Sequence, residues 1–230
     1  MTGIEEDLRW LGLHWDGPVL RQSARLDAYG AALGRLRERG LIYPCYCTRA
    51  EIAREIAASG AAPHGEEGPV YPGTCRAISR ALREGAYCWR LDMAKAAALA
   101  GLLTWDDGGE TITARPERFG DVVLARKDAP ASYHLAVTVD DAAQGVTDVV
   151  RGQDLFGATD IHRLLQALLV LPTPRYHHHA LVTDDSGRRP AKRNHAATLA
   201  DLRAAGVVPA DLLADLRAGR IAVGSPVASA

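Results

Sequence analysis

The 230-residue sequence has almost no net charge, few cysteines and no long apolar run. Its 27 Lys and Arg against 28 Asp and Glu give a formal net charge of −1, so any contact with RNA must come from local basic patches. Four cysteines in a chain of this length do not make a disulfide framework, and reduced cysteines indicate a cytoplasmic protein. Because no signal-peptide pattern or membrane-length apolar run is present, we expect no membrane partner.

Internal repeats and low-complexity tracts are absent, and the composition is that of a globular protein with a sizeable core. Periodicity and turn signals predict these segments: helices from the first residues to about 16 and over 23–40, 48–60, 159–170 and 196–216, and strands over 86–91, 102–105, 110–113, 121–126, 133–139, 146–151 and 176–183. Ser23 and Thr48 are the expected N-caps of the second and third helices, and Glu51 completes a capping box with Thr48.

The second half of the chain alternates strands with helices, which favours an α/β fold with a parallel sheet and crossover helices. The strands between 86 and 126 are expected to be antiparallel and inserted, and Cys88 on one of them is expected to be a core thiol. The apolar run 133–139 fits a strand of the parallel sheet. The paired acids Asp140 and Asp141 at its end fit a cap of the next helix, and the alternative is that they orient a ribose.

Three of the four cysteines lie in one short segment that is rich in loop-forming residues. Cys45 and Cys47 are followed by Tyr71 and Cys75. Thiolates are soft ligands, and three of them suit zinc, which prefers four donors in a tetrahedron. The fourth donor is the Tyr71 oxygen, His64 or water. The alternative is three unrelated core cysteines, because free cysteine is often buried, but their clustering favours a metal site.

Two polar side chains flank the expected parallel strands, where ligands of open α/β sheets bind. Arg151 closes the strand 146–151, and its guanidinium is suited to a bidentate contact with a carboxylate. Tyr133 is placed to donate to the same ligand. The competing interpretations are an ion pair of Arg151 with Asp148 or Asp154, and a core position for the ring of Tyr133.

A basic loop follows the last expected strand, running from Asp185 to His195 with four cations and a glycine. Such a loop leading into a helix suits phosphate binding, and Lys192 would neutralise charge that develops as pyrophosphate leaves. The competing interpretation is a solvated basic turn.

Taken together, six segments carry a resemblance to a known family. They are Leu11-Gly12-Leu13-His14-Trp15-Asp16, Arg21-Gln22-Ser23, the set Cys45, Cys47, Tyr71 and Cys75, the run from Tyr133 to Asp141, the run from Gln144 to Gly152, and Gly187 to Arg193. In this order they resemble the catalytic core of class I glutamyl-tRNA synthetases, and more closely the shortened paralogous family, the glutamyl-queuosine tRNA-Asp synthetases. The resemblance runs from about residue 4 to residue 217, and the stretch after Lys192 is too short for the anticodon-binding domain of the longer enzymes.

The resemblance implies a class I Rossmann-like parallel sheet with a small zinc-containing insert. The nucleotide-binding catalytic core would comprise 1–44 and 120–217, the insert 45–119, and a tail 218–230. The family activates glutamate with ATP, with Mg²⁺ on the phosphates, and places it on the queuosine base of tRNA-Asp. We therefore expect a monomeric ligase whose partners are glutamate, ATP and queuosine-containing tRNA-Asp.

Residue by residue, the resemblance implies one structural zinc ion held by Cys45, Cys47, Tyr71 and Cys75. It implies glutamate contacts from Tyr133 and Arg151. The ATP-loop lysine would be Lys192, the one side chain expected to act directly on the reacting phosphates.

The sequence departs from the family pattern at two places. Pro190 stands in the phosphate loop, where it removes a backbone N–H donor. The family's first strand and its His-x-Gly-His signature are missing, so we expect a start upstream of Met1. The alternatives are an inactive zinc- or tRNA-binding remnant and a fragment of an ordinary glutamyl-tRNA synthetase. His177, His178 and His179 cannot replace the signature, because successive strand residues face opposite sides; His178 matches a histidine of the family.

Overall fold

The structure, a computed structural model, describes residues 2–59, 64–65, 68–77, 85–181 and 198–218. The chain forms two compact units, of which one contains residues 1–20 and 180–230 and the other residues 21–179. No helix in the described ranges is both long enough and apolar enough to cross a membrane.

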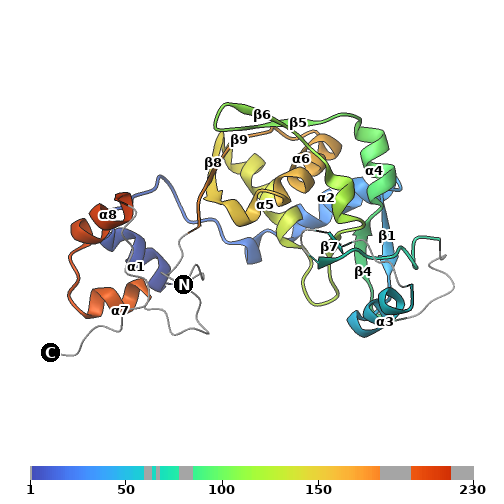
Figure 1. Ribbon diagram of the computed structural model, residues 1–230, viewed down its shortest axis with the longest axis horizontal. Helices are drawn as coiled ribbons and strands as arrows, with labels where there is room; N and C mark the ends of the chain where they lie inside the picture. The colour runs from blue at the N-terminus through green and yellow to red at the C-terminus, as the bar shows by residue number, and fades with distance from the viewer. Residues whose placement is uncertain (1, 60–63, 66–67, 78–84, 182–197, 219–230) are drawn as a thin grey trace. The chain divides into compact units, whose positions relative to one another are not determined.

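The smaller unit consists of helices in its described part (Figure 1): α1 (Thr2–Trp10), α7 (Leu199–Ala204) and α8 (Pro209–Arg217). Arg203 on α7 joins α7 to α1, because its Nη1 atom donates to Asp7 Oδ1 at 2.6 Å. Thr198 and Asp201 form a capping box at the start of α7. The helical tail predicted over 196–216 is thus divided in two, since Gly206 has a φ of 76° and Pro209 begins α8.

The larger unit contains two main sheets (Figure 1). The first is antiparallel, with the order β1-β4-β7: β1 (Ile42–Cys45), β4 (Cys88–Leu91) and β7 (Val123–Ala125). The second has the order β6-β5-β9-β8: β5 (Thr104–Asp107), β6 (Glu110–Thr113), β8 (Asp148–Gly152) and β9 (Arg175–His179). A short antiparallel pair is formed by β2 (His64–Gly65) and β3 (Gly68–Pro69).

The parallel part of the second sheet is made by β8 with β9 and by β9 with β5. The predicted parallel sheet is therefore present. The prediction that the middle strands are antiparallel holds for the pairs β1-β4, β4-β7 and β5-β6, but β5 also pairs in parallel with β9. Because β5 lies within 45–119, part of that segment belongs to the same sheet as β8 and β9.

Five helices accompany these sheets: α2 (Leu26–Glu38), α3 (Arg49–Ser59), α4 (Met93–Ala100), α5 (Tyr133–Gln144) and α6 (Ala158–Leu169). The core is centred on α6, where Ile161, Leu164 and Leu165 have no exposed surface. The capping box predicted for α3 is confirmed, since Thr48 N donates to Glu51 Oε2 at 2.7 Å and Glu51 N to Thr48 Oγ1 at 3.2 Å.

The predicted strand over 133–139 is wrong, because this run forms the first part of α5. Ser132 is its N-cap, with Oγ accepting from Leu135 N, and Gly145 ends the helix with a φ of 67°. Asp140 therefore lies inside a helix and caps nothing; its carboxylate accepts from Arg25 Nε at 2.6 Å and from Tyr29 Oη at 2.6 Å.

The predicted N-cap of the second helix is also wrong. Ser23 lies in a 3-10 turn (Gln22–Ala24), and α2 begins after Arg25, whose side chain makes no capping bond.

Candidate functional site

Arg151 lies near the end of β8, opposite His178 in the parallel pairing with β9. Its guanidinium donates to four side chains: His178 Nε2 at 3.1 Å, His162 Nδ1 at 3.2 Å, Thr159 Oγ1 at 2.6 Å and Tyr133 Oη at 3.5 Å. The structure thus brings together the predicted pair Arg151 and Tyr133. A guanidinium has five N–H groups, so these contacts leave one N–H on Nη2 without a partner among the described residues.

The hydrogen bonds assign the tautomers of three histidines around this arginine. Arg151 is only a donor, so His178 Nε2 and His162 Nδ1 both accept from it. The other nitrogen of His178, Nδ1, therefore carries the proton and donates to Asp107 Oδ1 at 2.9 Å. In the same way, His162 Nε2 carries a proton and donates to His134 Nδ1 at 3.2 Å. Two neutral imidazoles, those of His162 and His178, thus accept from the Arg151 guanidinium, and His134 extends the hydrogen-bond network beyond His162.

The pKa values agree with neutral imidazoles. Burial, followed by the nearby charge of Arg151, lowers the pKa of His134 to about 4. Burial also lowers the pKa of His162 well below its usual value and lowers that of His178, whose side chain has no exposed surface. Near pH 7 the guanidinium is therefore the positive charge of this cluster, which we call the arginine cluster (Asp107, Tyr133, His134, Arg151, Thr159, His162 and His178).

No carboxylate within the described ranges forms an ion pair with Arg151. Asp148, one partner considered for it, is instead held by Arg175 Nε at 2.9 Å and by His177 Nε2 at 3.3 Å. The ring of Tyr176 faces the guanidinium carbon at 5.0 Å, which adds a cation–π contact but no counter-charge. The nearest negative charges act on the guanidinium indirectly, Asp107 through His178 and Asp141 without a direct contact. The guanidinium thus keeps one N–H open to an anionic ligand.

Tyr133 is half-exposed at the first position of α5, so its hydroxyl is accessible beside Arg151. Lys192 lies outside the described residues, and its place relative to Arg151 stays a prediction.

Sequence reasoning missed Asp107, His134, Thr159 and His162 as members of this cluster. A signal existed for two of them: Thr159 and His162 are three residues apart, so they share one face of α6, and both are buried polar side chains on that helix.

The predicted metal ligands also converge. The Sγ atoms of Cys45, Cys47 and Cys75 all lie within 4.8 Å of one another. Tyr71 Oη is 3.3 Å from Cys45 Sγ and 3.5 Å from Cys47 Sγ, and it accepts from Cys75 N at 2.9 Å. We call these four residues the thiol cluster. The side chain of His64, the other candidate ligand, lies outside the described residues.

The donor set of the thiol cluster fits zinc. Cys47 Sγ and Cys75 Sγ are 3.4 Å apart, close to the edge of about 3.8 Å expected for a tetrahedron with Zn–S bonds of about 2.3 Å. Hydrogen bonds with the thiol of Cys88, and then with Tyr71 and Arg90, lower the pKa of Cys45 to about 4, which favours the thiolate form that a metal ligand needs. Burial raises the pKa of Cys47 to about 11, and a bound cation would oppose that rise.

Asp121 ties the thiol cluster to its surroundings. It is almost fully buried, accepts from the hydroxyl of Tyr43, and accepts from Arg76 Nη2 at 2.7 Å. Tyr43 and Arg76 stand next to the two cysteine-bearing segments, so this one carboxylate fixes both. Cys88 pairs with Cys45 across β1 and β4 and is half-buried there, which agrees with the expected core thiol.

Comparison with known proteins decides the family. Residues 1–222 match the model of the catalytic domain of class I tRNA synthetases for E and Q. The chain belongs to the class I tRNA synthetases.

Among curated relatives, a glutamyl-Q tRNA(Asp) synthetase of Rhodobacter capsulatus is 51% identical over 221 residues, covering 90% of this chain and 78% of its own length. Proteins of the same name from Nocardia farcinica and Deinococcus radiodurans are 48% and 46% identical and are covered over 65% and 68% of their lengths. The chain therefore falls in the glutamyl-Q tRNA(Asp) synthetase branch and spans about two thirds to three quarters of these relatives.

The fold agrees with solved structures of this class. A glutamate tRNA ligase of Elizabethkingia meningosepticum, solved in complex with its amino acid, superposes with a TM-score of 0.63 at 22% identity. The superposition covers 84% of this chain and 41% of that enzyme. Class I synthetases are ligases that use ATP, and the mixed α/β fold with a parallel sheet is the one expected for their catalytic domain.

Proposed function

We propose that the protein activates glutamate with ATP and transfers it to the queuosine base of tRNA-Asp. The observation that carries the proposal is Arg151, a positive charge held by neutral side chains and lacking a carboxylate partner in the described ranges. A guanidinium that has no direct carboxylate contact and keeps one N–H unused can bind an anionic ligand, and its planar shape suits a carboxylate.

Tyr133 and Arg151 would together hold the side-chain carboxylate of glutamate, which is the group that glutamine lacks. The Tyr133 contact to Arg151 is long, at 3.5 Å, so an incoming carboxylate can take over that N–H and also use the remaining N–H on Nη2. Thr159, His162 and His178 keep the guanidinium from turning while this exchange takes place. A fixed donor loses little conformational entropy on binding, which favours affinity.

The proposed chemistry needs positioning and charge stabilisation. A carboxylate oxygen of glutamate attacks the α-phosphorus of ATP, the bond to the bridging oxygen breaks, and pyrophosphate leaves with that electron pair. The activated acyl group then passes to an oxygen of the queuosine base, and AMP departs. Such a reaction requires alignment and neutralisation of the phosphates, for which we propose Lys192 and Mg²⁺.

The thiol cluster would hold one structural zinc ion through Cys45, Cys47, Cys75 and either Tyr71 or His64. A closed set of four protein donors leaves no open position for substrate, so the metal would stabilise the fold rather than take part in the reaction. We propose 45–119 as the segment that carries the zinc site, although β5 within it joins the core sheet, with 1–44 and 120–217 as the catalytic core and 218–230 as a tail. A monomer in the cytoplasm, where tRNA is charged, completes the proposal.

Transfer of labelled glutamate to three RNAs tests the proposal: tRNA-Asp with queuosine, the same tRNA with guanine in its place, and tRNA-Glu. We expect labelling of the first alone. Labelling of tRNA-Glu would indicate an ordinary glutamyl-tRNA synthetase. An inactive remnant would label none of the three, whether or not it binds them.

A further inference from the structure

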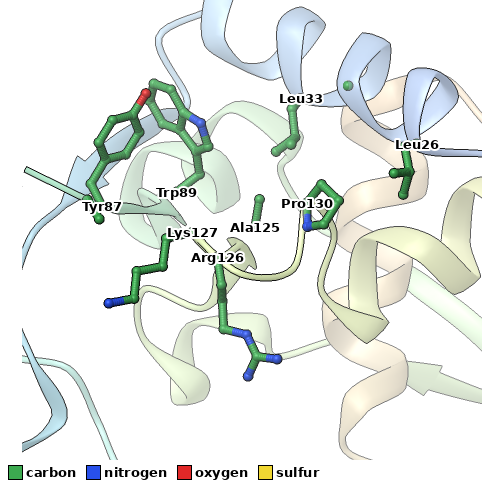
Figure 2. Close-up of a pocket in the computed structure, with 10 residues that line it drawn as sticks. Leu26, Leu33, Tyr87, Trp89, Ala125, Arg126, Lys127 and Pro130 are labelled. Carbon is green, nitrogen blue, oxygen red and sulfur yellow. The ribbon is translucent and has the colours of Figure 1, made fainter. Parts of the chain in front are cut away.

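A cavity of about 400 Å³ lies between α2, β4, β7 and the turn that follows β7 (Figure 2). It is separate from the arginine cluster, since the two share no residue. It uses the face of β4 opposite the thiol cluster, because Cys88 pairs with Cys45 on one face while Tyr87 and Trp89, its neighbours, line the cavity on the other. The volume lies in the range of sites for one small ligand.

One wall of the cavity is aromatic. The rings of Tyr87 and Trp89 lie 5.3 Å apart and nearly perpendicular, and Tyr46 supports Tyr87 from outside at 5.4 Å. Both lining rings are only half-buried. Such a wall is rigid and presents π surface, on which a flat ring can stack.

The facing wall is aliphatic. Figure 2 shows Leu26, Leu33 and Pro130 on one side, Tyr87 and Trp89 on the other, and Ala125 between them. Leu26 is 46% exposed despite being a large apolar side chain. An aromatic wall opposite an aliphatic wall is the arrangement that proteins use to hold an unstacked base.

The rim of the cavity is positively charged. Arg126 and Lys127 are both exposed lining residues, and none of the other described residues that line the cavity is acidic. Arg126 makes only a solvent-exposed ion pair with Asp128 at 3.5 Å, which is weak, and Lys127 forms no ion pair within the described ranges. Cations beside an aromatic slot are complementary to a nucleotide, whose base is flat and whose phosphate is anionic.

We propose that this cavity binds one unpaired nucleotide of the tRNA, with the base between the aromatic and aliphatic walls and the phosphate beside Lys127. The proposal rests on the proposed function, which supplies tRNA as the nucleic acid. A lipid or apolar peptide fits the cationic rim less well, and a base-paired segment would present phosphates without a free base. The cavity would thus help to orient the tRNA from a point that is separate from the reacting atoms.

Two variants separate stacking from charge: Tyr87→Leu removes the π surface, and Lys127→Ala removes a cation. Lys95→Ala, an exposed lysine on α4 outside the cavity, is the control. Dissociation constants are measured for uncharged, queuosine-containing tRNA-Asp over a series of salt concentrations. We expect Tyr87→Leu to weaken binding roughly tenfold without changing the salt slope. Lys127→Ala should weaken it by roughly threefold to tenfold and reduce the slope by about 0.9.

Glutamate-dependent ATP–pyrophosphate exchange without tRNA should be the same in all four proteins. If exchange is present and both cavity variants bind tRNA as the wild type does, the cavity proposal is overturned while the proposed function stands. If the wild type catalyses no exchange, the proposed function fails, and the binding data still decide whether the cavity holds RNA. Because Lys127 is exposed, its variant keeps the test valid even if Tyr87→Leu is unstable.

Discussion

The thiol cluster and the arginine cluster differ in the sign of the charge that each would bind. In the thiol cluster, three sulfurs and a phenol oxygen turn their lone pairs toward one another, which favours a cation at the centre. In the arginine cluster, neutral hydroxyl and imidazole groups accept from a cation that the protein itself supplies, and one N–H of that cation stays open to an anion. The difference agrees with the proposal that a metal ion closes the first cluster, whereas the second stays open for a substrate anion.

The largest effect should come from removing the cation of the arginine cluster. Arg151→Ala leaves a substrate carboxylate without its charged partner, a loss of about 2–5 kcal/mol, so kcat/KM for glutamate should fall at least about thirtyfold. Arg151→Lys keeps the charge but loses the planar fork and most of its partners, and should recover little. Glutamate-dependent ATP–pyrophosphate exchange measures both.

Metal content provides the control for these two variants, because the account treats the clusters as independent. Both Arg151 variants should bind as much zinc as the wild type. An Arg151→Ala protein with kcat/KM within threefold of the wild type would contradict the role given to the arginine cluster.

The next largest effect should come from opening the thiol cluster. Cys75→Ser replaces a soft donor with a hard one, so the bound zinc should be lost and stability should fall by about 3 kcal/mol or more. For a chain of this size that lowers Tm by about 6 °C or more. Zinc per chain and thermal unfolding check the prediction.

Cys88→Ser is the matched control, because Cys88 lies on β4 beside Cys45 but outside the three converging sulfurs. It should keep the metal. Equal zinc loss in both variants, or no zinc in the wild type, would argue against the proposed ligand set.

The sequence predicted which residues stand at the centre of each cluster better than it predicted the side chains that contact them. Arg151 was placed correctly at the end of a strand, and Cys45, Cys47, Tyr71 and Cys75 were correctly grouped. The run 133–139 was misassigned because a short apolar run fits a strand and a buried helix equally well. Only Ser132 and Gly145, its two caps, distinguish the alternatives.

The sequence did not predict which side chains from distant parts of the chain meet in the folded structure. Asp107, His162 and His178 come from β5, α6 and β9, and they meet at Arg151 only because β5 pairs in parallel with β9 and α6 packs in the core. Helix α4 was missed because eight alanine-rich residues follow a strand within a region read as β structure. Its N-cap, Asp92, accepts from Lys95 N at 3.2 Å and was the available signal.

A smaller effect should follow from loosening the support of Arg151. Asp107→Ala frees His178 to adopt the other tautomer, in which Nε2 carries the proton and no longer accepts from Arg151. We expect KM for glutamate to rise about tenfold, equivalent to about 1.4 kcal/mol, with kcat little changed. Steady-state exchange kinetics measure the two constants separately.

Asp107→Asn should restore most of the affinity, because its amide oxygen still accepts from His178 Nδ1. Asp106→Ala, on the same strand, removes only an acceptor for Gly109 N at the neighbouring turn and serves as the control. An equal rise in KM for all three variants would indicate a general loss of structure instead of positioning.

The last expected effect is a pH dependence of stability. The native pKa of His134 is about 4, below its unfolded value of about 6.5, so between these values the unfolded state binds more protons. Stability should therefore fall as pH drops through this window, by up to about 1.4 kcal/mol per pH unit for this one histidine. His134→Gln should make the dependence shallower. Urea unfolding of the wild type and this variant at pH 7, 6 and 5 tests this, and identical slopes in both proteins would rule it out.

The most direct test of the central claim is ATP–pyrophosphate exchange by the wild-type protein with glutamate, glutamine or aspartate as the amino acid. An arginine cluster that recognises a carboxylate at a fixed distance predicts exchange with glutamate and little with the other two. Exchange that is absent with glutamate, or equal for glutamate and glutamine, would contradict the assignment of Arg151 and Tyr133 to the substrate carboxylate.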